Sequence, residues 1–479
     1  MDGADPERQA LAHVESLIQQ LYGGNASPDA VAAIQSELQS YQSRDPFGWI
    51  LADHLLGSRD VNARFFGALT FTVKINQQPQ GEDDSSVLSK LLDWFVHFVS
   101  RDEPQLVLRK LSSALVTLFV QPRTRWRRPV RHVLYCLNSG AAVAESSIEC
   151  DTTIEVLLRS LSDQVLQSLL AFTTTLAEES VNVPHNSEYS SCHERLKENL
   201  HDVMSLLHFL FKSALGQQEQ FQGDLLDAYQ AWISYTRATF SRSSDREYID
   251  IFKQLLVPIM GYLLRADTFD STAEFLIDLF TANDDDFVSE EQFAAFSNLL
   301  DSDWANSQLR DLVPEPTEDS LTFARLVLSF GQAMANRLVN DRHRQNTDRI
   351  LSLMHYITRS IECDTIDQAV GGAICDFWDN YTISVPVDDI GNAHIQQTLS
   401  EARRTWKQAI GELCHAAALP LGVNGDFITV TSEHPMTEFR SRVRSTMQAS
   451  YDDFGFLVLE SLVSTALGAY GIGKHSYQD

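Results

Sequence analysis

The run that comes closest to a catalytic motif lies near the end of the chain and reads Gly468-Ala-Tyr-Gly-Ile-Gly473-Lys474-His475. Its spacing approaches the phosphate-binding loop G-x-x-x-x-G-K-[ST], in which backbone N–H groups and the lysine hold nucleotide phosphates. His475 replaces the hydroxyl that binds Mg²⁺, and the segment before the glycines has helical spacing where the motif needs a strand. We therefore expect no nucleotide site and no cofactor here.

A second candidate is the acidic run 283–291, which has some of the spacing of a calcium-binding loop. When Val288 is aligned with the apolar position of that loop, Asp286 stands where glycine is needed and Gln292 stands where the bidentate glutamate belongs. The ligand set is therefore incomplete. We interpret these carboxylates as favourable charges in front of a helix N-terminus.

A third candidate combines His201 and His208, which are seven residues apart and so share one helix face, with Cys192 and His193 upstream. A zinc site needs about four converging ligands, whereas these histidines lie beside a leucine-rich stretch and fit the edge of a core. The sequence also lacks H-E-x-x-H, G-x-S-x-G and a complete G-x-G-x-x-G. We predict no metal site, no catalytic residues and no enzymatic activity.

One basic cluster, Arg123-Thr-Arg125-Trp126-Arg127-Arg128-Pro129-Val-Arg131, stands out in an acidic chain. It could bind phosphate or an acidic protein surface, with Trp126 stacked on guanidinium groups. Alternatively, it is a solvated loop between helices whose Pro129 opens the next helix. The sequence leaves both interpretations open.

Composition limits the classes of partner. The 37 Lys and Arg residues against 65 Asp and Glu residues give the 479-residue chain a net charge of −28. This charge disfavours nucleic acids and anionic membranes and favours basic proteins as partners. No apolar run approaches the roughly 20 residues that span a bilayer, and the six cysteines form no Cys-x-x-Cys pair. We expect a soluble intracellular protein with reduced thiols.

The elements that carry these residues are predicted to be helices almost throughout. Apolar residues recur at helical spacing from Val31, Ile34, Leu38 and Tyr41 onward, behind the start signal at Ser27. Helices are then expected around residues 47–55, 61–75, 87–100, 104–120, 129–138, 152–179, 193–215, 221–240, 246–264, 269–280, 290–300, 319–338, 347–361, 367–382, 395–417, 436–451 and 454–467. The strand-like residues 427–431 are interpreted as a loop or a short helix.

About twenty such helices, paired at a period near 40 to 47 residues, match the spacing of HEAT or armadillo repeats. The predicted fold is therefore all-α: a right-handed α-solenoid, or superhelix, of about ten HEAT-like helix pairs. A stack of this kind leaves an extended surface that binds large partners.

The helix from Asn62 to Ile75 resembles the second-repeat inner helix of importin-β-type nuclear transport receptors. Its run Phe65-Phe66-Gly67-Ala68 resembles the x-x-F-F-G-A-x-x-L-x-x-K-I pattern of the importin thirteen and transportin three branch. Small side chains at Gly67 and Ala68 permit close helix packing. Three later segments, 268–273, 373–378 and 439–444, resemble the same branch in the same order. Trp126 with the helix after it also resembles the W-P-x-x-I segment of that branch, although Arg127-Arg128 departs from the usual pattern.

The resemblance covers essentially the whole chain but only about half of a full receptor, because that family typically has about twenty repeats. The chain is therefore identified as the N-terminal portion of a fungal-type receptor. The resemblance implies that residues 1–150 bind the GTPase Ran in its GTP form. It also implies that residues 151–479 continue the solenoid as an arch for cargo and Ran. The resemblance places the Ran contacts at Arg64, Phe65, Lys74, Asn76 and Trp126. Phe65 and Phe66 cannot both face outward, so at least one is expected in the core.

The remaining partners follow from the same resemblance: protein cargo with basic surfaces, and Phe-Gly nucleoporins that insert phenylalanines between neighbouring outer helices. No direct contact with nucleic acid or membrane is expected, and the protein would shuttle between nucleus and cytoplasm through the nuclear pore. A HEAT-repeat scaffold or adaptor of another complex is the alternative, although it would not require the Phe-Phe-Gly-Ala helix followed by the Phe377-Trp378 helix. An enzyme with a helical accessory domain would need a site that the sequence does not reveal.

Overall fold

The computed structural model describes residues 4–23, 27–77, 84–101, 103–148, 152–240, 246–282, 288–313, 316–340, 345–360, 368–386, 392–417 and 435–455, together with residues 460 and 463. Within these ranges every regular element is a helix and no strand occurs, which confirms the all-α prediction. The chain divides into two units, Met1–Gln254 and Leu255–Asp479. The expected functional subdivision at residue 150 falls inside the first unit.

The first unit is a succession of short helices. They are α1 (Ala4–Tyr22), α2 (Pro28–Ser43), α3 (Phe47–Leu56), α4 (Val61–Gln77), α5 (Ser85–Val99), α6 (Gln105–Val120), α7 (Pro129–Ser139), η1 (Glu145–Ser147), α8 (Ile154–Leu158), α9 (Asp163–Ser180), α10 (Ser190–Lys197), α11 (Leu200–Lys212), η2 (Leu215–Gln217), α12 (Glu219–Phe240) and α13 (Arg246–Lys253).

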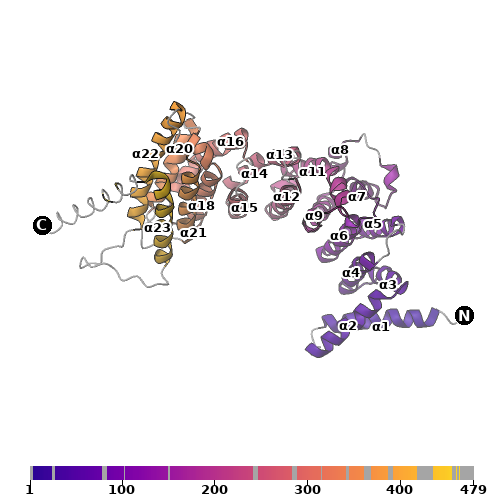
Figure 1. Cartoon of the computed structure of the whole chain (residues 1–479). Coiled ribbons are helices and arrows are strands. Elements are labelled where there is room, and N and C mark those ends of the chain that lie inside the picture. Colours follow the sequence, from indigo (N-terminus) through magenta and orange to yellow (C-terminus); the bar gives the residue numbers. More distant parts are fainter. Residues whose placement is uncertain are drawn as a thin grey trace. The chain divides into compact units, whose positions relative to one another are not determined.

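These helices form two rows, in which each helix packs against the next of its own row and against a partner in the other. Row B contains α2, α4, α6, α9 and α12, which contact one another in that order. Row A contains α1, α3, α5, α7, α11 and α13. Figure 1 shows both rows following the chain from α1 to α13. Such a stack of helix pairs is the predicted solenoid, because each pair buries its apolar face only against its neighbours.

Several helices begin at the capping residues and prolines that the sequence indicates. The Ser27 side chain accepts a hydrogen bond from the Ala30 backbone N–H at 3.3 Å, and Pro28 occupies the first turn of α2. Pro129 occupies the same position in α7. At the start of α16, the backbone N–H of Ser289 donates to Gln292 Oε1 at 2.7 Å. The residue that failed as a calcium ligand is therefore part of a helix cap.

The first helix, α1, was not expected from the sequence. Its position is determined by packing against α2, α3 and α4. Its apolar residues enter one cluster with residues of α2, α3 and α4: Leu11, Val14, Leu17, Ile18, Ile34, Leu38, Leu51, Leu55, Ala63 and Phe66. A surface helix is stabilised mainly by such an apolar stripe and less by intrinsic propensity.

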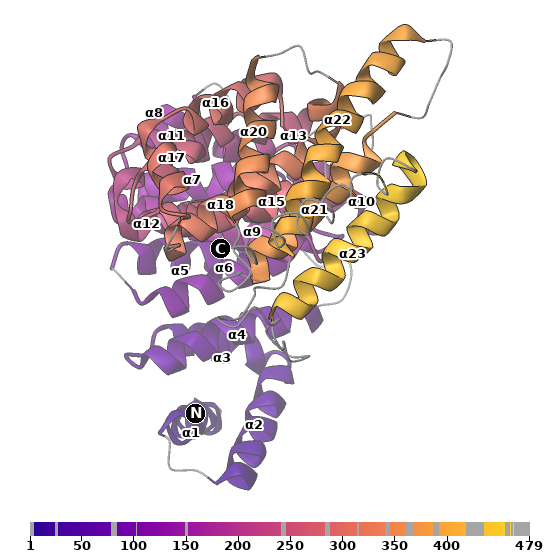
Figure 2. The same cartoon turned by 90° about the vertical axis from the view of Figure 1, so that its left-hand side faces the viewer.

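The second unit repeats the two-row arrangement. Its helices are α14 (Leu256–Met260), η3 (Gly261–Leu264), α15 (Phe269–Thr281), α16 (Glu290–Leu300), α17 (Asp303–Arg310), α18 (Glu318–Ala333), α19 (Ala335–Asn340), α20 (Gln345–Ser360), α21 (Gln368–Ile383), α22 (Ala393–Ala416) and α23 (Pro435–Phe454). Row B here is α15, α18, α21 and α23, and row A is α14, α16, α20 and α22. In Figure 2 the later members of both rows lie in orange and yellow.

Four expected helices are broken in the structure. Residues 152–179 form α8 and α9, and residues 193–215 form α10, α11 and the start of η2. Residues 246–264 form α13, α14 and η3, and residues 319–338 form α18 and most of α19. The first break occurs because Ser162 has an extended backbone and starts a new helix. Short extra helices, α8 and α10, stand between successive members of row B. As a result α4, α6, α9 and α12 begin at residues 61, 105, 163 and 219, mostly further apart than the expected period. The predicted segments 427–431 and 456–467 lie outside the described ranges, apart from residues 460 and 463.

Candidate functional site

Helix α4 carries four of the five predicted contact residues, and it lies between α3 and α6. Phe66 is 6% exposed and belongs to the core cluster with α1, whereas Phe65 is half-buried. This confirms that one of the two phenylalanines faces inward. Asn76 is exposed at the C-terminal end of the helix.

Arg64 connects α4 to the turn between α5 and α6. Its guanidinium donates to Glu103 Oε1 from Nε at 2.6 Å and lies 2.5 Å from the same oxygen through Nη2. Nη1 also donates to the Ser58 carbonyl oxygen at 2.8 Å. Both side chains of the ion pair are largely buried, at 14% and 9% exposure. Arg64 is therefore committed to holding neighbouring repeats together.

Lys74 is a buried cation, with only 3% of its side chain exposed. Its Nζ atom lies 2.5 Å from Asp45 Oδ1 and 5.9 Å from the centre of the Trp49 ring. A buried ammonium requires such a partner because desolvation disfavours the unpaired charge. In this conformation Lys74 is a packing residue of the second repeat.

The C-terminal end of α4 meets the basic segment 121–128. The Gln121 side chain donates to Asn76 Oδ1 at 3.1 Å, and Arg123 Nη2 donates to the Ile75 carbonyl oxygen at 3.1 Å. Arg123 also lies 3.3 Å from Asp84 Oδ1. The structure thus brings four of the predicted contacts and the basic segment into one connected region.

Trp126, at 2% exposure, is inside this region and not on its surface. Its indole N–H donates to His132 Nδ1 at 2.9 Å, and its ring meets Phe119 edge-on at 6.1 Å. Because the indole nitrogen can only donate, His132 Nδ1 must be the acceptor, and Nε2 donates to the Val143 carbonyl oxygen at 2.8 Å. Burial lowers the pKa of His132 below its ordinary value of 6.5, which favours this neutral form.

Most of the basic cluster 123–131 has acidic partners within the chain. Arg127 lies 2.7 Å from Glu198, and Arg131 binds both oxygens of Asp202 at 2.8 and 3.1 Å. The Glu145 carboxylate accepts the backbone N–H groups of Arg127 and Arg128, each at 3.0 Å. The interpretation as a loop that opens α7 therefore fits this segment better than stacking of Trp126 on guanidinium groups.

A cavity of about 700 Å³ lies between α5, the basic segment and the residues after α7. It is lined by Asp84, Ser85, Leu88, Ser89, Leu92, Arg123, Thr124, Arg125, Trp126, His132, Ala142, Val143, Ala144 and Glu145. Arg125 is exposed, and it has no ion pair among the described residues. Arg125 is therefore the part of the basic segment most available to a partner.

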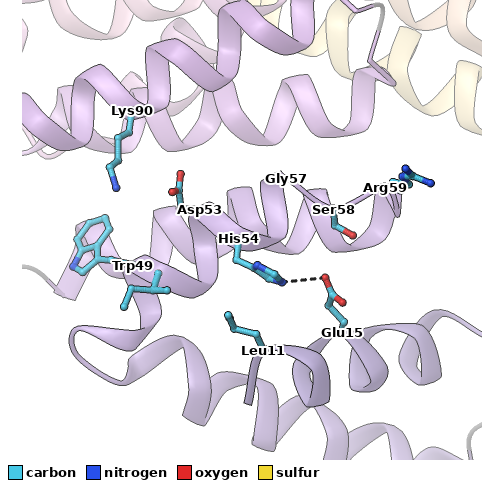
Figure 3. Close-up of a pocket in the computed structure, with 10 residues that line it drawn as sticks. Leu11, Glu15, Trp49, Asp53, His54, Gly57, Ser58, Arg59 and Lys90 are labelled. Carbon is cyan, nitrogen blue, oxygen red and sulfur yellow. Dashed lines mark ion pairs between the residues drawn. The ribbon is translucent and has the colours of Figure 1, made fainter. Parts of the chain in front are cut away.

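A second hollow, here called the α1–α3–α5 groove, has a volume of about 680 Å³. Its lining residues, drawn in Figure 3, come from α1, α3, the turn after α3 and α5: Leu11, Glu15, Trp49, Ile50, Asp53, His54, Gly57, Ser58, Arg59 and Lys90. No motif in the sequence points to this groove. In the sequence, Ile50 is one of several apolar residues of α3. Only the packing of α3 against its neighbours shows that Ile50 is exposed and not part of the core.

The described residues contain no group of three or more His, Cys, Asp or Glu side chains able to hold a metal ion. His201 and His208 are both exposed on α11, while Cys192 and His193 are buried on α10. The calcium-loop residues 283–287 and the whole run 468–475 lie outside the described ranges.

The thiols that the structure describes are poor nucleophiles. Cys136, Cys192 and Cys375 are buried and Cys414 is half-buried, and none of these four forms a disulfide. Burial raises the pKa of Cys136, Cys192 and Cys414 to about 11 and that of Cys375 to about 12. A thiol with such a pKa stays protonated at neutral pH, so these cysteines serve packing.

No helix within the described ranges combines the length and the apolar character that crossing a membrane requires.

Two comparisons with known protein sequences found similar proteins. A domain described as Xpo1, Exportin 1-like protein, matches residues 104–276. An importin beta-like protein, kap111 of Schizosaccharomyces pombe, is 21% identical over 100% of this chain. The chain spans 48% of that relative's length.

Among solved structures, a circular tandem repeat protein with a novel repeat topology aligns with 98% of each chain at 11% identity and a TM-score of 0.37. A similarity at this level defines no shared fold. Residues 104–276 are thus similar to an Exportin 1-like domain, and the whole chain is similar to part of an importin beta-like protein.

Proposed function

We propose that this protein is a nuclear transport receptor that binds Ran-GTP and protein cargo and carries the cargo through the nuclear pore complex. The observation that carries the proposal is the two-row helix stack of the first unit, which coincides over much of its length with the Exportin 1-like match at 104–276. The similarity to an importin beta-like protein over the whole chain supports it. Within the importin-β superfamily, we propose the importin thirteen and transportin three branch, of fungal type, on the Phe65–Ala68 run of α4.

The exposure of each side chain suggests two different roles for the proposed Ran contacts. Asn76 is exposed and Phe65 is half-buried, so these two side chains are proposed to touch Ran directly. Arg64, Lys74 and Trp126 are proposed to act indirectly, because their contacts hold α4 and the segment 121–128 in position. A ligand surface depends on such supporting contacts as well as on the atoms that it presents.

The net charge of −28 supports cargo with basic surfaces, since opposite charge raises the rate of encounter and the effect weakens with salt. Phe-Gly nucleoporins are proposed as further partners. The protein would then shuttle between nucleus and cytoplasm through the pore, without direct contact with nucleic acid or membrane. No catalytic step is assigned to this chain, because the GTP belongs to Ran.

The test is a pull-down of the recombinant chain with Ran locked in the GTP state and with Ran-GDP. The proposal expects capture of the GTP form only, and the exposed variant Asn76→Arg should weaken that capture. Asn336→Arg, a matched change at an exposed asparagine of α19, should leave it unchanged. Equal capture of both nucleotide states, or capture of neither, would favour a HEAT-repeat scaffold of another complex.

A further inference from the structure

The α1–α3–α5 groove has an apolar floor, two carboxylates that contact other residues of the chain and two cations that form no ion pair within the described residues. The floor consists of Ile50, which is 41% exposed, the half-buried Trp49 and the buried Leu11. Ligand pockets are concave and lined mainly by apolar and aromatic side chains, with a few polar groups. Ile50 therefore offers an anchoring point for an apolar side chain of a partner.

The two carboxylates of the groove are already engaged within the chain. Glu15 Oε1 lies 3.3 Å from His54 Nε2, the contact drawn as a dashed line in Figure 3. Asp53 Oδ1 accepts the indole N–H of Trp94 at 2.8 Å. Each carboxylate keeps its negative charge, but one of its oxygens already faces a donor of the protein.

The two cations of the groove have no such partner. Lys90 and Arg59 are both exposed, and neither forms an ion pair with any residue in the described part of the chain. Figure 3 shows Lys90 above Trp49 at one end of the groove and Arg59 at the other end. A cation without an ion-pair partner among the residues that the structure describes therefore lies at each end of the apolar floor. These two cations belong to a protein whose net charge is −28.

We propose that the α1–α3–α5 groove binds an extended acidic peptide segment with apolar anchors, one of which packs against Ile50. Its flanking carboxylates pair with Lys90 and Arg59. Charge complementarity selects this occupant over a basic peptide, which would find one oxygen of each carboxylate engaged and two cations facing it. The proposal does not depend on Ran binding, because the proposed Ran contacts lie on α4 and the segment 121–128 and none of them lines the groove.

The test uses three fluorescein-labelled peptides and measures fluorescence anisotropy with the full chain. The first is acidic with apolar anchors (DEDFGDLED), the second replaces its carboxylates by amides (NQNFGNLQN), and the third replaces its anchors by alanine (DEDAGDAED). The first peptide should bind at least about fivefold more tightly than either of the others.

Variants of the chain place the binding at the groove. Lys90→Glu and Ile50→Ser should each weaken binding of the acidic peptide about fivefold. Two matched controls on other surfaces of the same unit, Arg125→Glu and Val156→Ser, should leave it unchanged, since both residues are exposed, Val156 at 59%. Lys90→Glu should not weaken binding of the amide peptide. Circular dichroism melting of every variant excludes unfolding as the cause.

Three results would overturn the proposal. Equal binding of the acidic and the amide peptide would show that the groove takes a neutral aromatic segment. Failure of both peptides to bind would show that the groove is no peptide site. Tight binding that survives both Lys90→Glu and Ile50→Ser would place the peptide elsewhere. Each result leaves the comparison of Ran-GTP with Ran-GDP unaffected, so the two proposals can fail separately.

Discussion

Gly67 of α4 lies so close to Ala52 of α3 that a Cβ atom built on the glycine would be 2.9 Å from the Ala52 carbonyl oxygen. The same atom would be 3.0 Å from the Leu56 backbone nitrogen. Both obstacles are backbone atoms of a helix, which cannot move aside as a flexible side chain can. The missing side chain at Gly67 therefore sets the distance between the two helices of the second repeat.

Gly67→Ala should destabilise the first unit by about 1 to 3 kcal/mol, because the added methyl group forces α3 and α4 apart. The matched control is Gly223→Ala in α12, where a Cβ atom would meet nothing within 4 Å. That change should stabilise the protein by about 0.5 to 1 kcal/mol, since alanine is the better helix former. Urea denaturation of both variants measures the difference, and equal effects would contradict the packing argument.

Asp202→Asn should destabilise the protein by about 1 to 3 kcal/mol, because Arg131 then loses a charged partner while its side chain stays largely buried. The Arg131 and Asp202 side chains are only 12% and 10% exposed. Glu198→Gln, which weakens the exposed pair with Arg127, should cost less than about 1 kcal/mol. Thermal unfolding compares the two variants. A larger loss of stability for Glu198→Gln would contradict the greater contribution expected from the Arg131–Asp202 pair.

The stability of the first unit should fall as the pH drops below about 6.5, in part through His132. Its folded-state pKa is lowered by burial, so between that pKa and the ordinary 6.5 the unfolded chain binds more protons. Stability in that window therefore rises with pH. Protonation of Nδ1 also removes the acceptor that holds the Trp126 indole.

His132→Gln preserves an acceptor and a donor at this position but does not titrate, so the variant should lose less stability than the wild type between pH 7.5 and 5.5, roughly the range where histidine changes charge. Melting temperatures across that range measure the slope. The exposed His394→Gln serves as the control and should keep the slope of the wild type. An unchanged slope in His132→Gln would rule out this histidine as the cause.

Phe65→Ala and Asn76→Arg should weaken Ran-GTP binding with little change in melting temperature, because both side chains reach the surface. Lys74→Ala should weaken binding only together with a loss of stability, since it leaves the core without the pair to Asp45. Binding and melting measured on the same preparations separate the two roles. Lys74→Ala with full stability and no Ran binding would instead identify Lys74 as a direct contact.

The sequence alone was sufficient for features that depend on neighbouring residues. The helical spacing from Val31 onward, the start signals at Ser27 and Pro129 and the close packing expected at Gly67 all agree with the structure. The reason is that capping, backbone preference and amphipathic period act within a few residues along the chain. These local terms were enough to predict an all-helical stack.

Only the tertiary structure decided which of the predicted contacts remain accessible. Trp126 and Lys74 are buried, and Arg131 meets Asp202 from 71 positions away in the sequence. The α1–α3–α5 groove likewise exists only because three helices pack together. Burial and ion pairing depend on which helix faces stack, and the hydrophobic effect that drives stacking has no direction along the chain. Local spacing therefore predicts the helices, while the assembled stack determines the surface.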